Sequence, residues 1–114
     1  MRPEDELFIV NVQATIPPRV KAMVGAAAVT GYHEEEAAKV LDPITKLLKR
    51  KGLNATCEWR TGEPSQQIME AVKRHKAHLI VMGTHGYGAL GRAVMGSIAQ
   101  RVLHDADLPV LMVK

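Results

Sequence analysis

The fold of this chain is decided by the stretch Gly83-Thr84-His85-Gly86-Tyr87-Gly88-Ala89-Leu90-Gly91-Arg92-Ala93-Val94-Met95-Gly96-Ser97, which contains five glycines in fifteen residues. It follows the apolar, strand-like residues 79–82 and leads into a helix expected over residues 97–105. Open α/β sheets bind ligands where the carboxyl end of a strand meets the next helix. The unpaired amides of a helix start also favour an anion. The stretch therefore predicts a phosphate-binding loop.

Ser97 has two possible roles at this helix start, and the sequence leaves both open. Its hydroxyl can donate a hydrogen bond to a phosphate. It can also cap the helix, because the residues Ser97-Ile98-Ala99-Gln100 have the spacing of a capping box.

The segments around this loop alternate between strand-like and helix-like patterns. Residues 7–12 and 79–82 are nearly continuous apolar runs, which is typical of strands buried on both faces of a parallel sheet. Residues 55–60 alternate between apolar and polar side chains and predict a strand at a sheet edge. The expected order is strand 7–12, helix 33–51, strand 55–60, helix 64–76, strand 79–82, helix 97–105 and strand 110–113. This order predicts an α/β domain with an open parallel sheet and right-handed crossovers.

The segment between the first two expected strands begins with a weakly periodic stretch. Pro17-Pro18 ends the first strand, and residues 19–32 predict a loop with at most a helical turn. Helical spacing of apolar residues begins at His33. Pro43 is expected to kink or split that helix, with Asp42 capping a second segment, and Gly52 is expected to cap its end.

The composition limits the classes of function. The 114 residues fit one domain, taken as 1–114. A dispersed net charge of +3 and 4% aromatic residues argue against a nucleic-acid groove. No apolar run reaches the roughly 18 residues of a membrane span. The single cysteine, Cys57, favours a reducing compartment, so the expected location is the cytoplasm, and the thiol is expected to be buried and inert.

The spacing of the loop resembles a known signature. Gly83, two residues, Gly86, nine residues and Gly96-Ser97 resemble the nucleotide-binding motif of the universal stress protein family. Residues 79–86 resemble that family's fourth strand and turn, and residues 97–103 and 107–113 resemble its last helix and strand. The resemblance implies an adenine-nucleotide α-hydrolase-like, Rossmann-like fold.

The resemblance also implies a function, a ligand and a set of site residues. It implies an ATP-binding regulatory protein of the stress response, possible use of Mg²⁺ with the ATP, and no catalysis or very slow hydrolysis. Gly83, Gly86, Gly96 and Ser97 would hold the phosphates and ribose, and Val12 would line the adenine side. The full set of nucleotide-binding residues comprises Val12, Met82, Gly83, His85, Gly86, Arg92, Gly96, Ser97 and Ile98.

The chain departs from the family pattern at its start. Residues 7–12 match the family's second strand, so the aspartate-bearing first strand and first helix, central to the order 3-2-1-4-5, are expected to be missing. Either residues 7–12 and 79–82 then pair directly or another chain fills the gap, because unpaired buried amides are costly. We expect a homodimer or higher homo-oligomer, formed through the apolar edge strand Val110–Val113 and the surface that the missing strand would expose.

Several residues allow a functional and a structural interpretation. His85 could act as a general base, but no acid, metal cluster or nucleophile stands beside it in sequence, so a local loop role is favoured. Arg92 could reach a terminal phosphate or be a solvated surface charge. The histidines show no metal-ligand spacing, so no metal site and no catalytic residue are assigned. The competing function is a dimerisation or interaction module that has lost its ligand.

Overall fold

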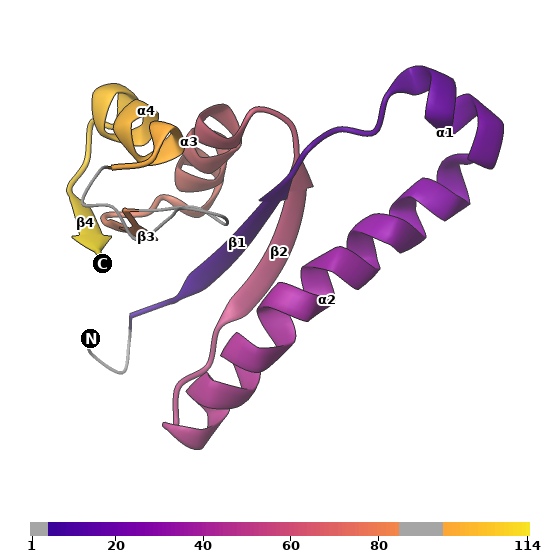
Figure 1. Ribbon diagram of the computed structural model, residues 1–114. Coiled ribbons are helices and arrows are strands. Elements are labelled where there is room, and N and C mark those ends of the chain that lie inside the picture. Colours follow the sequence, from indigo (N-terminus) through magenta and orange to yellow (C-terminus); the bar gives the residue numbers. More distant parts are fainter. Residues whose placement is uncertain (1–4, 85–94) are drawn as a thin grey trace. The chain divides into compact units, whose positions relative to one another are not determined.

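The structure is a computed structural model that describes residues 5–84 and 95–114. Contacts divide it into two compact units, Met1–Gly62 and Glu63–Lys114, each containing a pair of parallel strands (Figure 1). The first unit contains β1 (Phe8–Gln13), α1 (Pro18–Val24), α2 (Ala26–Arg50) and β2 (Thr56–Thr61). The second contains α3 (Pro64–His75), β3 (Ile80–Gly83), α4 (Ser97–Asp105) and β4 (Val110–Val113).

The first unit is a two-stranded parallel sheet with a long helix on one face. The register of β1 and β2 runs from Phe8 opposite Thr56 to Gln13 opposite Thr61. Helix α2 contacts both strands (Figure 1). It buries Ala37 and Leu41, and its Thr45 hydroxyl lies 3.4 Å from the Cys57 sulfur. Cys57 is accordingly half-buried beneath α2 rather than exposed.

The expectation of a loop over residues 19–32 is wrong, since α1 and the first turns of α2 occupy it. Pro18 stands at the first position of α1, where its missing N–H costs nothing. The two helices are separated by Gly25 alone, which has φ +91°. A positive φ at this angle favours glycine, so one residue provides the break that was expected to take a whole loop.

The expected split at Pro43 is also wrong, because α2 continues through it from Ala26 to Arg50. Asp42 is an exposed residue inside the helix and not a cap. Proline removes one N–H donor from the ladder. Leu41, which is buried against the sheet, and Thr45, whose hydroxyl donates to the Leu41 carbonyl at 2.9 Å, anchor the turns on either side. Packing therefore outweighs the local cost of the proline.

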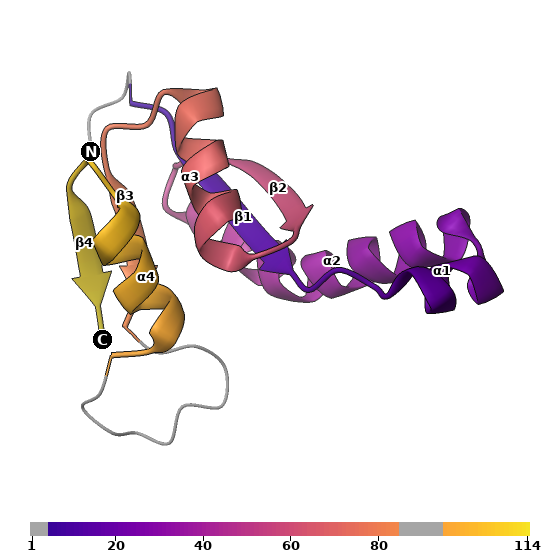
Figure 2. The ribbon, with the colours of Figure 1, turned by 90° about the horizontal axis from the view of Figure 1, so that it is seen from above.

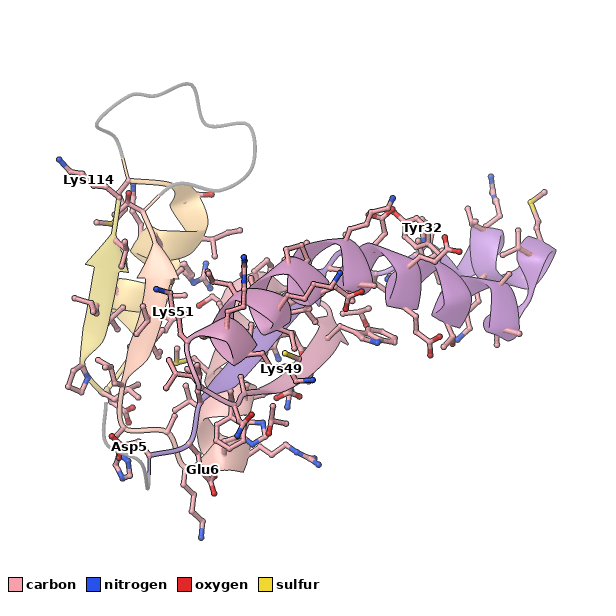
Figure 3. All side chains as sticks on the ribbon, turned by 90° about the horizontal axis from the view of Figure 1, so that it is seen from below. Asp5, Glu6, Tyr32, Lys49, Lys51 and Lys114 are labelled. Carbon is pink, nitrogen blue, oxygen red and sulfur yellow. The ribbon has the colours of Figure 1, made fainter. Side chains whose placement is uncertain are left out.

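The expected glycine cap at the end of α2 is confirmed. Gly52 has φ +73°, and its N–H donates to the Lys49 carbonyl at 3.0 Å. The Leu53 N–H donates to the Leu48 carbonyl at 2.8 Å. These two bonds form a Schellman motif, which requires the left-handed conformation at this glycine. Lys49 and Lys51 mark this end of the helix in Figure 3.

The second unit places two helices on one side of its sheet. Strands β3 and β4 pair in parallel, with Ile80 opposite Val110 and Gly83 opposite Val113. Helices α3 and α4 pack against each other on the same side of this pair (Figure 2). Ile80 is buried, whereas the alternate residues Val81, Leu111 and Val113 are 58%, 53% and 48% exposed. One face of this sheet is therefore packed, and the other is an open apolar surface.

The α/β class with parallel strands, expected from the alternating pattern, is confirmed. Strand pairing, which the sequence left open, is confined to β1 with β2 and β3 with β4 among the described residues. The half-polar β2 accordingly has a single strand neighbour, as expected of an edge. Within the described ranges, no helix is both long enough and apolar enough to cross a membrane.

Candidate functional site

The start of α4 places its first backbone amides where helices commonly bind anions. Gly96 is the N-cap residue, in an extended conformation, and no side chain of residues 5–84 or 95–114 caps this end. The first intrahelical donor is the Gln100 N–H, which bonds to the Gly96 carbonyl at 3.0 Å. The backbone N–H groups of residues 97–99 precede this bond, so they have no carbonyl of their own helix to donate to. Amides in this position point out along the helix axis, where the helix dipole favours a negative group.

The capping-box interpretation of Ser97 is wrong. Ser97 is the first helical residue, one position beyond the cap, and it is exposed. Gln100 does not reach back to the cap, because its side-chain amide donates to the Met95 carbonyl at 2.9 Å. The other role expected for the Ser97 hydroxyl, a hydrogen bond to a phosphate, stays a prediction.

Two backbone hydrogen bonds of Thr84 join the end of β3 to the end of β4 and to the start of α4. The Thr84 N–H donates to the Val113 carbonyl at 2.9 Å, and the Thr84 carbonyl accepts from the Gly96 N–H at 2.6 Å. The two ends of the glycine-rich loop therefore meet at the carboxyl edge of the sheet. The Gly96 amide is committed to protein, so this glycine would serve a ligand through its lack of a side chain and not through its N–H.

The structure brings together five of the nine predicted binding residues. Met82 and Gly83 end β3, and Gly96, Ser97 and Ile98 begin α4, all within the second unit. Val12 lies half-buried on β1 in the first unit and is not placed with them. His85, Gly86 and Arg92 lie outside the described residues.

A polar network at the carboxyl end of β1 was missed in the sequence. The Gln13 side-chain amide donates to the His33 carbonyl and to Asn11 Oδ1, both at 2.9 Å. Gln13 Oε1 lies 2.7 Å from His33 Nδ1 and accepts its proton in the matching tautomer. His33 is only 3% exposed. Asn11 and Gln13, two polar residues at alternate positions of an otherwise apolar strand, were the sequence pattern that could have indicated this network.

Aromatic rings surround the buried histidine of this network. The His33 ring stacks on Trp59 of β2 with a centroid distance of 5.3 Å and an interplanar angle of 26°. The ring of Tyr32, labelled on α2 in Figure 3, makes an edge-type contact with the His33 ring at a centroid distance of 5.4 Å. The cluster fixes the carboxyl ends of β1 and β2 against α2, at the edge where open α/β sheets bind ligands. In the described part of the chain, no three His, Cys, Asp or Glu side chains come together in a way that could hold a metal.

Comparisons with known proteins agree on one family. The model of the universal stress protein family matches residues 2–114. Universal stress protein MJ0531 of Methanocaldococcus jannaschii is 40% identical over 81 residues, covering 71% of this chain and 48% of that protein. The chain spans about half the length of the curated relatives it matches.

Solved structures show the same fold. The structure of MJ0577 superimposes with a TM-score of 0.78 at 25% identity, covering 96% of this chain and 76% of that one. UspA of Lactobacillus plantarum gives a TM-score of 0.73 at 21% identity, covering 96% of this chain and 77% of that one.

Proposed function

Because the chain belongs to the universal stress protein family, we propose that it is a nucleotide-binding regulatory module of the stress response, with ATP as its ligand. The start of α4, which no side chain of the described residues caps and which is hydrogen-bonded through Gly96 to Thr84 after β3, is the observation that supports this proposal most. The amides of residues 97–99 and the Ser97 hydroxyl would bind the phosphates. Exposed Ile98, at 42%, would offer an apolar contact to the ligand.

We propose that the module acts by binding ATP and not by hydrolysing it. A phosphohydrolase needs a base and a charge-stabilising partner placed around the scissile phosphate. His85, the candidate base inside the loop, has no acid, metal cluster or nucleophile beside it in sequence. Mg²⁺ would be bound mainly through the phosphate oxygens, because this ion keeps most of its waters and uses few protein ligands. The expected site of action is the cytoplasm.

Isothermal titration of the protein with ATP and Mg²⁺ tests binding. Ser97→Asp places a negative charge where the phosphate would lie, while an acidic residue in the first turn suits the helix itself. We expect measurable heat with the unsubstituted protein and at least roughly tenfold weaker binding for Ser97→Asp, equivalent to about 1.4 kcal/mol. Ser97→Ala is the matched control and should weaken binding less. Absence of heat at millimolar ATP would reject the proposal.

A second candidate function is an interaction module that has lost its ligand. It is favoured by the open apolar face of the β3–β4 sheet, since parallel sheets are normally covered on both faces. Self-association would use this face, the edge of Val110–Val113, or the edges of β1 and β3. Native mass spectrometry separates the two functions, because a co-purified nucleotide supports the first and a nucleotide-free oligomer supports the second.

A further inference from the structure

The hydrogen bonds of Gln13 determine which nitrogen of the His33 ring carries the proton. The Gln13 side-chain nitrogen donates to two oxygens, the His33 carbonyl and Asn11 Oδ1, both at 2.9 Å. These two bonds fix the orientation of the amide, so its oxygen is the atom that lies 2.7 Å from His33 Nδ1. Because this oxygen can only accept, Nδ1 must carry a proton. In the neutral ring, Nε2 is then an unprotonated acceptor.

The second ring nitrogen, His33 Nε2, has no hydrogen-bond partner among residues 5–84 and 95–114. Within the same ranges, no side-chain nitrogen or oxygen is both buried from solvent and unpaired, so Nε2 remains in contact with solvent. The residue as a whole is only 3% exposed. His33 therefore presents one acceptor atom at a surface that otherwise covers its side chain.

Neighbouring rings hold this acceptor in place. The His33 ring stacks on half-buried Trp59 at a centroid distance of 5.3 Å and contacts the Tyr32 ring at 5.4 Å. Tyr32 is 50% exposed, so aromatic surface next to His33 is open to solvent. An acceptor that is already ordered loses little entropy when a ligand binds. Ligand sites commonly combine such aromatic surface with a few precisely placed polar atoms.

We propose that His33 Nε2 is the acceptor of a binding site for a planar ring that carries an amino group, with Gln13 as the residue that positions its proton. All the side chains of this site belong to the first unit. They lie at the carboxyl ends of β1 and β2, where open α/β sheets bind ligands. Exposed Tyr32 would supply a stacking surface for the ring.

The chemistry of the acceptor selects the ligand. An amino group donates to the unprotonated Nε2, whereas a ring without that group leaves the nitrogen desolvated and unpaired. The identification of the ring as adenine rests on the proposed function, because adenine is the base of ATP and carries one amino group. A donor from the second unit is the competing occupant of Nε2, and the experiment below distinguishes it from a ligand.

Adenosine and purine riboside test the acceptor, because purine riboside has hydrogen in place of the amino group and neither compound has phosphates. Nitrogen NMR of histidine-labelled protein reports Nε2 directly. We expect Nε2 to be unprotonated and free of a hydrogen bond without ligand, and its signal to shift when adenosine is added. Purine riboside should bind about tenfold more weakly. The fluorescence of Trp59, the single tryptophan, gives an independent titration.

His33→Asn and His33→Gln form a matched pair of variants. The shorter asparagine amide can donate to Gln13 as Nδ1 does, but it has no atom in the place of Nε2. The longer glutamine side chain can place its amide oxygen there. We expect His33→Asn to bind the two compounds equally and His33→Gln to keep a preference for adenosine. Gln13→Leu, which no longer holds the proton on Nδ1, should lose the preference as well, and circular dichroism checks that each variant folds.

Three results would overturn the proposal. Equal affinities of the unsubstituted protein for the two compounds would exclude an acceptor for the amino group, as would a preference that persists in His33→Asn. An Nε2 signal that is already hydrogen-bonded without ligand would show that another part of the chain occupies this atom. Absence of adenosine binding would remove this site alone, because the response of the amides of residues 97–99 to ATP tests the phosphate site separately.

Discussion

The buried hydroxyl of Ser65, in the first turn of α3, donates a 3.1 Å hydrogen bond to the carboxylate of Asp105, in the last turn of α4, forty positions away. The same carboxylate also bonds to Arg101 at 3.2 Å and to His104 at 3.0 Å. An acidic residue is unfavourable at the C-terminal end of its own helix. The hydrogen bond from Ser65 at the start of α3 offsets this unfavourable position of Asp105. It also joins α3 to α4 in the second unit.

Ser65→Ala should therefore destabilise the second unit. Ser65 is 0% exposed, and loss of its bond should lower the free energy of unfolding by about 1 to 2 kcal/mol. Urea unfolding followed by far-ultraviolet circular dichroism measures the change. Ser97→Ala is the matched control, because Ser97 is exposed and caps nothing. Equal losses in the two variants would show that the Ser65 bond does not stabilise the helix pair.

The decrease in the free energy of unfolding at low pH should depend in part on Asp105. Hydrogen bonding from His104 first, and then from Ser65 and Arg101, lowers the pKa of Asp105 below its ordinary value of 3.8, against the opposing effect of desolvation. Because the unfolded chain then takes up the proton more readily, the stabilisation is present above pH 3.8 and is lost as the pH falls through the folded pKa. Asp105→Asn should flatten this dependence in urea titrations between neutral and acid pH. The same pH dependence of stability in Asp105→Asn and in the unsubstituted protein would contradict this role of Asp105.

Gln13→Leu should disturb the first unit at its carboxyl edge. The substitution leaves the buried His33 Nδ1 without its partner, which should cost about 1 to 3 kcal/mol in unfolding free energy. Trp59, the single tryptophan, stacks on His33, so its fluorescence should change in the folded state as well. The exposed Gln66→Leu serves as the control. Indistinguishable emission spectra and unfolding curves would contradict the structural role of the network.

Pro43→Ala should raise the stability of α2. Pro43 is exposed and lies inside a helix, where proline costs up to about 3 kcal/mol relative to alanine. Alanine restores the missing N–H donor without removing a buried contact. The thermal unfolding midpoint should rise, with Asp42→Ala as the neighbouring control at an exposed position. A lower midpoint would mean that the proline is needed for the packing of α2 on the strands.

The sequence predicted the parts of the fold that depend on local signals. The bounds of α4 and β4 were predicted correctly, because glycine and proline delimit short apolar patterns there. The start of α2 was missed because Gly31 and the alanines before it dilute the helical periodicity. Continuity through Pro43 depends on packing against the strands, which no local pattern records.

The candidate site was predictable in part for the same reason. Gly83, Gly96 and Ser97 lie on consecutive elements, so strand-to-helix order alone brings them together. The Gln13 and His33 side chains are twenty positions apart and meet only when α2 folds onto β1. Commitment of the Gly96 amide to Thr84 is likewise a backbone detail that residue types do not encode.

The proposed function depends on the backbone amides at the start of α4 binding the phosphates of a nucleotide. Amide chemical shifts measured by NMR during titration with ATP and Mg²⁺ test it most directly. We expect saturable shifts of the Ser97, Ile98 and Ala99 amides that adenosine without phosphates does not produce. Unchanged shifts at these three amides, while the protein binds ATP elsewhere or not at all, would contradict it.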